Sequence, residues 1–266
     1  MASANIVRKF KTLTGMVTNG EILRYTYRRM KRIKPVSYSV DYIGKKTLGT
    51  ITHVITDEPV AALTFDGGPD PRWTPRILEV LEKYNVPGTF FMIGKYAEQY
   101  PEIVKMVAER NHSIANHSWN HPGFPLISRA ERRRQLRKCS TVLYPYEVKM
   151  FRAPYLDQSI SSRIDLLLMG YKVIAGNVKI HDERIDNPDE LYREIKKSII
   201  PGSIVLLHDV VCIYRDTSRE VTVGALDKLL EETKNTFTYV TLPELLKIGK
   251  PNKENIYKTA ERPPVS

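Results

Sequence analysis

The sequence predicts an α/β protein whose strands run parallel and curve into a barrel. Three observations support this fold class. From residue 60 onward, strand-like apolar segments alternate with segments of helical periodicity, which is typical of a parallel sheet. Polar clusters lie at or just after the ends of predicted strands, where the loops of a barrel carry its chemistry. The chain has 266 residues and is 42% apolar, which is enough for one substantial core.

The chain before residue 60 is predicted to form an arm and an extended lead-in. Residues 36–54 favour extended segments around the turn Gly44-Lys45-Lys46, and Asp57-Glu58-Pro59 marks the entry to the first core strand. We therefore expect a basic arm and lead-in over residues 1–56, one domain over 57–249, and a polar, proline-rich tail over 250–266.

The predicted strands are short and apolar. Residues 60–65 form a run that is typical of a buried strand, and residues 88–93 form the next one. The remaining strand candidates are residues 113–115, 150–152, 172–175, 203–207 and 238–241.

The predicted helices fill the intervals between these strands. Residues 74–84 carry apolar side chains at helical spacing, and the helix over residues 101–110 begins with proline, whose missing donor costs nothing in a first turn. Ser128 and Glu131 have the spacing of a capping box, which predicts a helix over residues 128–141 with its arginines in solvent. The other predicted helices cover residues 159–169, 189–199, 220–233 and 243–248.

The first polar cluster follows the strand predicted at residues 60–65. The sequence there is Thr64-Phe65-Asp66-Gly67-Gly68-Pro69, so Asp66 stands between an apolar run and a glycine-rich turn. An ordinary turn has this composition, because Gly allows positive φ and Pro stops the strand. A catalytic carboxylate presented at a strand end has it too, and the cluster alone leaves both interpretations open.

The other clusters follow at intervals along the chain. His117 and His121 are four residues apart, so on a helix, or at the start of one, both imidazoles face the same ion. A pair at this spacing is also common on protein surfaces. Arg152 begins the sequence Arg-Ala-Pro-Tyr, and His208 directly follows the strand predicted at residues 203–207.

Taken in this order, the clusters resemble the polysaccharide deacetylase family, or NodB homology domain, whose members are metal-dependent hydrolases that remove acetyl groups from amino sugars. The resemblance implies a distorted (β/α) barrel of about seven parallel strands over residues 57–249, in agreement with the pattern of elements. It departs from the family at one position. The family's first cluster is usually Thr-Phe-Asp-Asp-Gly-Pro, and its second Asp, which binds the metal, is Gly67 here.

The resemblance also implies roles for individual residues. His117 and His121 hold a divalent ion, zinc by expectation, Asp66 is the general base, and His208 is the general acid. A divalent ion suits amide hydrolysis because it polarises the carbonyl and lowers the pKa of bound water towards about 7.

Four further residues support this chemistry by resemblance. Arg152 pairs with Asp66, and Pro154 and Tyr155 shape the acetyl pocket, with the Tyr155 backbone N–H available to the oxyanion. Asp182 is the expected partner of the catalytic histidine, although the surrounding stretch departs from the family's commonest form.

Gly67 leaves the expected ion with two neutral imidazole ligands. Loss of a supporting partner already lowers metal affinity or activity by about tenfold to a hundredfold, so loss of a direct ligand should cost at least as much. We do not expect Asp70 to replace it, because Pro69 and Pro71 brace it in a turn. Three functions remain open: an impaired deacetylase of acetylated glycans, a carbohydrate-binding pseudoenzyme, and an amide hydrolase acting on a lipid-linked sugar.

The positive charge is concentrated in the arm. The net charge is +11, and residues 1–34 contribute +8 of it, so we expect no nucleic-acid-binding face on the body of the protein. The apolar and cationic side chains of residues 22–32 suit either contact with an anionic membrane surface or packing on the body.

The sequence as written shows neither a signal peptide core nor a stretch of about 20 apolar residues. We therefore expect a cytoplasmic protein or one peripheral to the membrane, although family members are often secreted or periplasmic. Cys139 and Cys212 are predicted to be free thiols.

Overall fold

The computed structural model describes residues 44, 46–211 and 217–256. The chain divides into two compact units, Met1–Leu48 and Gly49–Ser266, and the second contains the elements discussed below. The basic arm and Cys212 lie outside the described residues, whereas Cys139 is a buried free thiol. Among the described residues, no helix is both long enough and apolar enough to span a bilayer.

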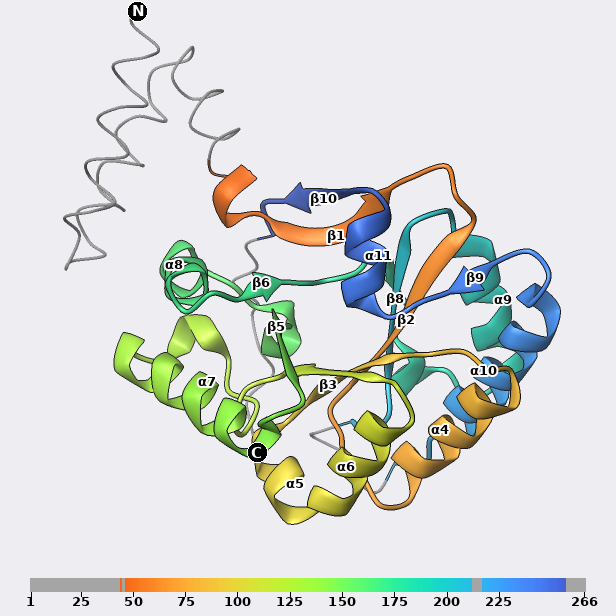
Figure 1. The fold of residues 1–266 in the computed structure, drawn as a ribbon, viewed down its shortest axis with the longest axis horizontal. Coiled ribbons are helices and arrows are strands. Elements are labelled where there is room, and N and C mark those ends of the chain that lie inside the picture. Colours follow the sequence, from red (N-terminus) through yellow and green to blue (C-terminus); the bar gives the residue numbers. More distant parts are fainter. Residues whose placement is uncertain (1–43, 45, 212–216, 257–266) are drawn as a thin grey trace, which may run out of the picture. The chain divides into compact units, whose positions relative to one another are not determined.

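Ten strands of the described chain form one curled sheet (Figure 1). Its order is β10-β1-β8-β2-β3-β4-β5-β6, with β7 added to β8 and β9 added to β2. The strands are β1 (Thr50–Ile55), β2 (Val60–Asp66), β3 (Thr89–Met92), β4 (Ser113–Asn116), β5 (Glu147–Phe151), β6 (Lys172–Val173), β7 (Val178–Lys179), β8 (Ser203–His208), β9 (Thr238–Tyr239) and β10 (Lys250–Glu254).

The sheet closes on itself just after β6. Ile174 forms a parallel bridge with Ile51 of β1, and the Ala175 N–H donates to the Ile51 carbonyl at 2.8 Å. The predicted fold class, a distorted (β/α) barrel, is therefore confirmed. The strands from β2 to β6 and β8 pair in parallel, as the alternation of elements predicts, whereas β1 runs antiparallel to both β8 and β10.

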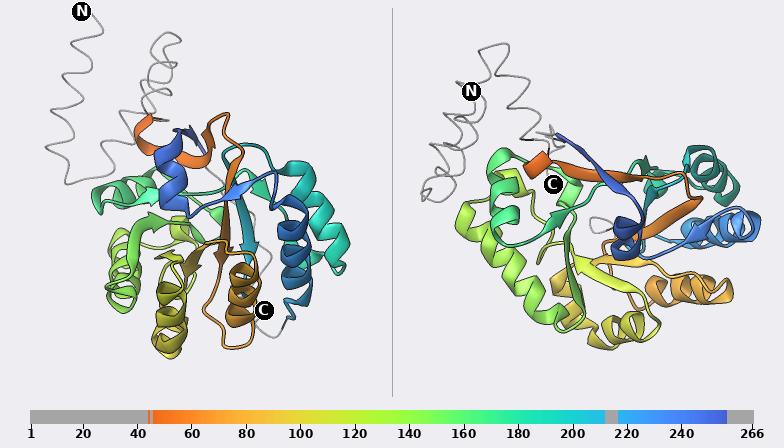
Figure 2. Two further views of the ribbon diagram at one scale, coloured as in Figure 1. Left: turned by 45° about the vertical axis from the view of Figure 1, so that its right-hand side comes forward. Right: turned by 45° about the horizontal axis from the view of Figure 1, so that its top comes forward.

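Helices cover the outside of this barrel (Figure 2). They are α4 (Trp73–Lys83), α5 (Gly94–Gln99), α6 (Pro101–Glu109), α7 (Arg129–Leu143), α8 (Ile160–Leu168), α9 (Pro188–Ser198), α10 (Glu220–Thr233) and α11 (Leu242–Ile248), with three short 3-10 turns, η1 (Phe124–Leu126), η2 (Pro154–Leu156) and η3 (Asp182–Arg184). Ser128 caps α7 by accepting from Glu131 N at 3.2 Å, but the Glu131 carboxylate binds Arg134, so the predicted reciprocal box is only half formed. Helix α5 was not predicted, because six residues are too few to show an apolar period.

Two strands lie outside the domain limits expected from the sequence. Strand β1 falls in the predicted lead-in, and β10 falls in the predicted polar tail, where it pairs antiparallel with β1. The sequence Lys250–Glu254 shows no apolar strand pattern, because its side chains are exposed or half-buried at a sheet edge. The strand pairs through backbone groups, which the side chains do not reveal. Residues 257–266 of that tail lie outside the described residues.

Strand β2 shows how the sequence aims residues into the barrel. All seven of its residues are buried. Leu63 and Phe65 pack with the outer helices, whereas Ala62 belongs to the apolar cluster inside the barrel together with Phe91. Because side chains alternate along a strand, Asp66 shares the inward face with Ala62 and stands at its carboxyl end. The first polar cluster is thus directed into the barrel mouth.

Candidate active site

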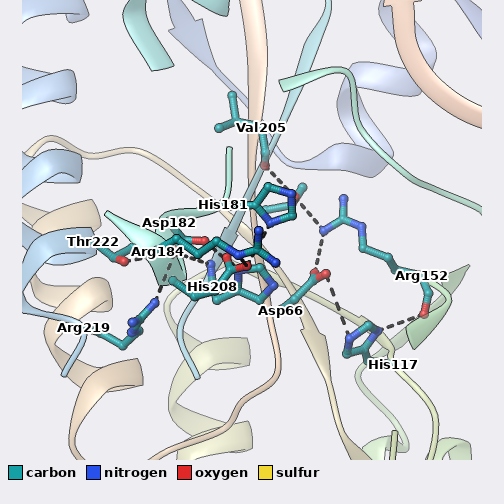
Figure 3. Close-up of polar contacts among 12 residues, drawn as sticks. Asp66, His117, Arg152, His181, Asp182, Arg184, Val205, His208, Arg219 and Thr222 are labelled. Atoms are coloured by element: carbon teal, nitrogen blue, oxygen red, sulfur yellow. Dashed lines mark hydrogen bonds and ion pairs between the residues drawn. The ribbon is translucent and has the colours of Figure 1, made fainter. Parts of the chain in front are cut away.

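Asp66 forms an ion pair with Arg152 in the barrel mouth (Figure 3). Arg152 follows β5 and is completely buried, with its guanidinium over the Phe91 ring at 4.2 Å. Its Nη1 donates to Asp66 Oδ1 at 2.5 Å and to Thr64 Oγ1 at 2.9 Å. Thr64 Oγ1 in turn donates to the Val205 carbonyl at 2.6 Å. One oxygen of Asp66 is therefore fixed by a buried cation, and Oδ2 faces His117.

His117 is held as a neutral imidazole with one nitrogen available. Its Nδ1 lies 2.9 Å from the Arg152 carbonyl, which only accepts hydrogen bonds, so Nδ1 carries the proton and Nε2 the lone pair. Nε2 lies 4.0 Å from Asp66 Oδ2. Burial lowers the pKa of His117 to about 3, with the nearby Arg152 and His208 charges acting in the same direction. This is the tautomer and charge state that a metal-binding histidine requires.

A turn, not a helix, brings His121 to His117. The loop after β4 passes through left-handed backbone at Ser118 (φ 72°) and His121 (φ 61°), and the His121 N–H donates to Ser118 Oγ at 3.0 Å. The two imidazole rings meet edge to face, with their centroids 4.9 Å apart. The predicted proximity of the pair is thus found, but the helical spacing offered as its reason is wrong. Gln135 of α7 steadies the loop by accepting from Trp119 N and Asn120 N.

His208 stands opposite Asp66 in the sheet. The two residues are register partners on the neighbouring parallel strands β8 and β2. The Asp182 carboxylate accepts two hydrogen bonds from His208, one from Nδ1 at 2.6 Å and one from the backbone N–H at 3.0 Å. Burial alone would lower the pKa of His208, but the Asp182 charge and hydrogen bond outweigh it and raise the pKa to about 9. His208 is therefore an imidazolium at neutral pH.

Asp182 has two further partners that sequence reasoning missed. Thr222 Oγ1 donates to Asp182 Oδ2 at 3.0 Å, and Arg219 Nη1 lies 3.6 Å from the same oxygen. Both belong to the start of α10, far from Asp182 in the chain, so no local sequence signal identifies them. Thr64, also missed, had a signal, because it precedes Asp66 by two residues on a strand and must share its face.

Pro154 and Tyr155 form the turn η2 beside the histidines. Pro154 is buried, whereas Tyr155 is 43% exposed and has a left-handed backbone (φ 57°). The Tyr155 ring meets the His121 ring edge to face at 4.6 Å between centroids. The structure thus gathers all of the predicted site residues at this end of the barrel.

A second group could hold a metal. Among the described residues, Asp182, Glu183 and His208 are the one set of three whose ligand atoms lie within 4.8 Å of one another. Both Asp182 oxygens already accept hydrogen bonds, however, and the Arg219 guanidinium lies beside Oδ2. A cation in that place would meet two positive neighbours, Arg219 and the His208 imidazolium, which disfavours it.

The position that usually supplies a third ligand lacks a side chain. Gly67 has a φ of 104°, and its N–H donates to the Phe91 carbonyl at 3.2 Å. Asp70 does not take over, because its Oδ1 accepts from Arg72 N at 2.9 Å and from Trp73 N at 3.3 Å, where it braces the start of α4. The donor set at His117 and His121 fits a divalent ion, but with one protein ligand fewer than the family pattern has.

Comparison with known proteins shows which family this chain is similar to. The family model described as "Polysaccharide deacetylase" matches residues 53–174. A peptidoglycan-N-acetylglucosamine deacetylase of Bacillus cereus is 32% identical over 199 residues, which cover 72% of this chain and 70% of the relative. A chitooligosaccharide deacetylase of Sinorhizobium fredii is 32% identical over 192 residues, covering 69% and 89%.

Solved structures give the same result for the fold. A peptidoglycan N-acetylglucosamine deacetylase in complex with a benzamide ligand superposes with a TM-score of 0.73 at 28% identity, covering 79% of this chain and 99% of that one. A protein of Bacillus anthracis described as a CE4 family pseudoenzyme gives a TM-score of 0.68 at 26% identity, covering 75% and 69%. A mutant of this pseudoenzyme is described as having restored enzymatic activity. The chain belongs to the polysaccharide deacetylase family.

Proposed function

We propose that this protein is a metal-dependent hydrolase that removes acetyl groups from N-acetylated amino sugars in a poly- or oligosaccharide, with activity reduced by Gly67. The observation that carries the proposal is the pairing of Asp66 and His208 on neighbouring strands. A candidate base and a candidate acid thus stand side by side in one mouth, and each is fixed by a buried partner of opposite charge. The histidine pair lies next to the base.

His117 and His121 are the residues that would hold a divalent ion, with zinc expected. When bound, the ion supplies a Lewis acid for the acetyl carbonyl and activates water for the attack. The His117 tautomer supports this assignment, because it leaves the lone pair on Nε2, the nitrogen that lies 4.0 Å from Asp66 Oδ2.

Asp66 takes the proton of the attacking water at Oδ2. Its Oδ1 is engaged by Arg152, so Oδ2 is the oxygen left to act as base. His208 gives a proton to the departing nitrogen from Nε2, because Nδ1 is held by Asp182. A general acid of this kind contributes about 10² to 10⁴ in rate. Retention of a base and an acid, each with its partner, favours an enzyme over a pure binding protein.

Tyr155 and Pro154 complete the site in this proposal. The left-handed turn at Tyr155 presents the segment next to His121, where its backbone N–H is the proposed donor to the oxyanion. The similar glycan deacetylases act on peptidoglycan and chitooligosaccharides by name, so acetylated glycans of these classes are the first substrates to test.

A carbohydrate-binding pseudoenzyme is the second candidate, and Gly67 is the observation that favours it. One of the similar structures is described as a pseudoenzyme of this group, so a deacetylase fold without turnover has a precedent. The third candidate, an amide hydrolase for a lipid-linked sugar, depends on the basic arm of residues 1–34, which lies outside the described residues. Liposome sedimentation with and without that arm tests membrane contact directly.

Acetate release from acetylated chitooligosaccharides and from peptidoglycan tests the main proposal. The metal-free protein is titrated with zinc, and Asp66→Asn and His208→Ala serve as inactive variants. His53→Ala is the matched control, since His53 lies on β1 and contacts Thr52. Zinc-dependent acetate release that only the two site variants lose supports the proposal. Zinc and glycan binding without any acetate release would establish the pseudoenzyme instead.

A further inference from the structure

Asp209, the residue after His208, lies buried between three parts of the site. Its Oδ1 accepts from the Gly68 N–H at 2.8 Å, and its Oδ2 accepts from Thr74 Oγ1 at 2.7 Å. Thr74, in the first turn of α4, also accepts from the Asp70 N–H at 2.9 Å. One carboxylate therefore connects the end of β8, the turn after Asp66, and helix α4.

The turn after Asp66 fits closely around this carboxylate. A Cβ placed on Gly68 would lie 2.0 Å from Asp209 Oδ2 and 2.7 Å from its Cγ. A side chain at residue 68 would therefore displace the Asp209 carboxylate, which occupies the space that it would need. On its other side the turn is bound to the residue that follows β3, since the Ile93 N–H donates to the Gly68 carbonyl at 2.8 Å.

The regular ladder between β2 and β8 does not extend to this turn. It ends at the pair Asp66 and His208, and the next backbone contact, from Val210 N to the Asp66 carbonyl, is stretched to 3.5 Å. The contact from Asp209 to Gly68 thus continues the connection between the two strands where the ladder weakens. It does so next to Asp66, Gly67 and His208.

The buried Asp209 carboxylate contributes little to the stability of the fold. Burial raises the pKa of Asp209 to about 7, the Thr74 and Gly68 donors oppose this, and the nearby Asp66 and Asp70 charges add to it. Buried charges contribute little net stability even when they are well paired. What the contacts need is a side-chain oxygen that accepts from Gly68 and a polar group that reaches Thr74, and an apolar residue would supply neither.

We propose that Asp209 is a positioning residue, which fixes the turn from Gly67 to Asp70 against the strand that carries His208 and so sets the distance between the proposed base and acid. The inference rests on the proposed function for its catalytic consequence, but its structural part stands by itself. Asp209 touches neither the acetyl group nor the metal in this assignment, so it acts only through Gly68 and Thr74.

Hydrogen exchange at the Gly68 amide tests the structural part in the full-length protein. We expect Asp209→Ala to reduce protection of that amide by at least about tenfold, because the amide loses its acceptor. Asp209→Asn should restore most of it, since the Asn side-chain oxygen still accepts from Gly68. Thr74→Val and Thr74→Ser form a second matched pair, in which only Ser keeps the hydroxyl. Asp189→Ala, at a surface aspartate paired with Lys228, is the control for removing a carboxylate.

Kinetics test the catalytic consequence. Misplacing the turn should lower kcat by about tenfold to a hundredfold in Asp209→Ala and Thr74→Val while KM changes by less than about threefold. Loss of kcat that Asp209→Asn and Thr74→Ser restore supports positioning. Unchanged Gly68 protection in Asp209→Ala would overturn the inference, and should that variant not fold, unchanged kcat in Thr74→Val would do so. If Asp209→Ala loses the Gly68 protection but the wild-type protein deacetylates nothing, the structural part of the inference is supported and the proposed function is contradicted.

Discussion

Replacement of Asp182 by Asn removes the charge that keeps His208 protonated. The Asn side-chain oxygen can still accept from His208 Nδ1, so the imidazole keeps its orientation. The variant loses the negative charge of Asp182, whose Oδ1 lies 2.6 Å from His208 Nδ1 in the wild type. It keeps the positive charge of Arg219, whose Nη1 lies 3.6 Å from Asp182 Oδ2. We therefore expect the pKa of His208 to fall from about 9 to its ordinary value of 6.5 or below.

The size of this effect follows from the shift itself. The interval from 6.5 to about 9 corresponds to about 3 kcal/mol of differential stabilisation of the imidazolium. With a pKa of 6.5, only about 3% of His208 would be protonated at pH 8, so kcat/KM should fall about thirtyfold there and less than about twofold at pH 6. The free energy of unfolding also depends on the protonation of His208. In the metal-free wild type, the contribution from charged His208 is complete below pH 6.5 and is lost as the pH rises through about 9.

A proton NMR titration of the His208 ring measures the pKa directly and needs no activity. Glu183→Gln is the graded control, because Glu183 Oε2 lies 3.9 Å from Nδ1 and should shift the pKa by less. Denaturant unfolding at pH 6 and pH 10 checks the stability term. A His208 pKa that moves by less than about half a unit in Asp182→Asn would show that Asp182 is not its governing partner. A shift in Glu183→Gln as large as the one in Asp182→Asn would show the same.

Three further predictions concern the metal site and the acid. Gly67→Asp should strengthen zinc binding in calorimetry and raise acetate release by at least about tenfold, despite roughly 1 kcal/mol or more of backbone strain at a φ of 104°. A variant that binds zinc tightly but releases no acetate would contradict the deacetylase proposal. His121→Ala should weaken zinc binding by at least about tenfold, and unchanged affinity would exclude the histidine pair as the site. His208→Ala should lower kcat by about 10² to 10⁴ in the same assay and spare glycan binding, whereas equal loss of binding would make His208 structural.

Much of the fold is visible in local sequence patterns. The apolar run of β2 is buried over its whole length, and the predicted strands at residues 88–93 and 203–207 correspond to β3 and β8, which flank it in the sheet. Polar residues at the ends of such strands must meet at one rim, because the strands are parallel. The gathering of Asp66, Arg152 and His208 was therefore predictable from the order of strands and polar clusters.

The tertiary structure alone decided how these residues are held. Arg219 and Thr222 reach Asp182 from α10, and Asp209 reaches Gly68 and Thr74, across separations along the chain that leave no local pattern.

Backbone geometry accounts for the remaining differences. His121 meets His117 through a left-handed turn whose φ values no spacing rule encodes, and β10 pairs through backbone groups that its polar side chains do not reveal. The sequence determines which side chains point into the barrel, because strand alternation is local. Their partners depend on which distant segments the closed sheet brings together, and only the folded chain fixes that.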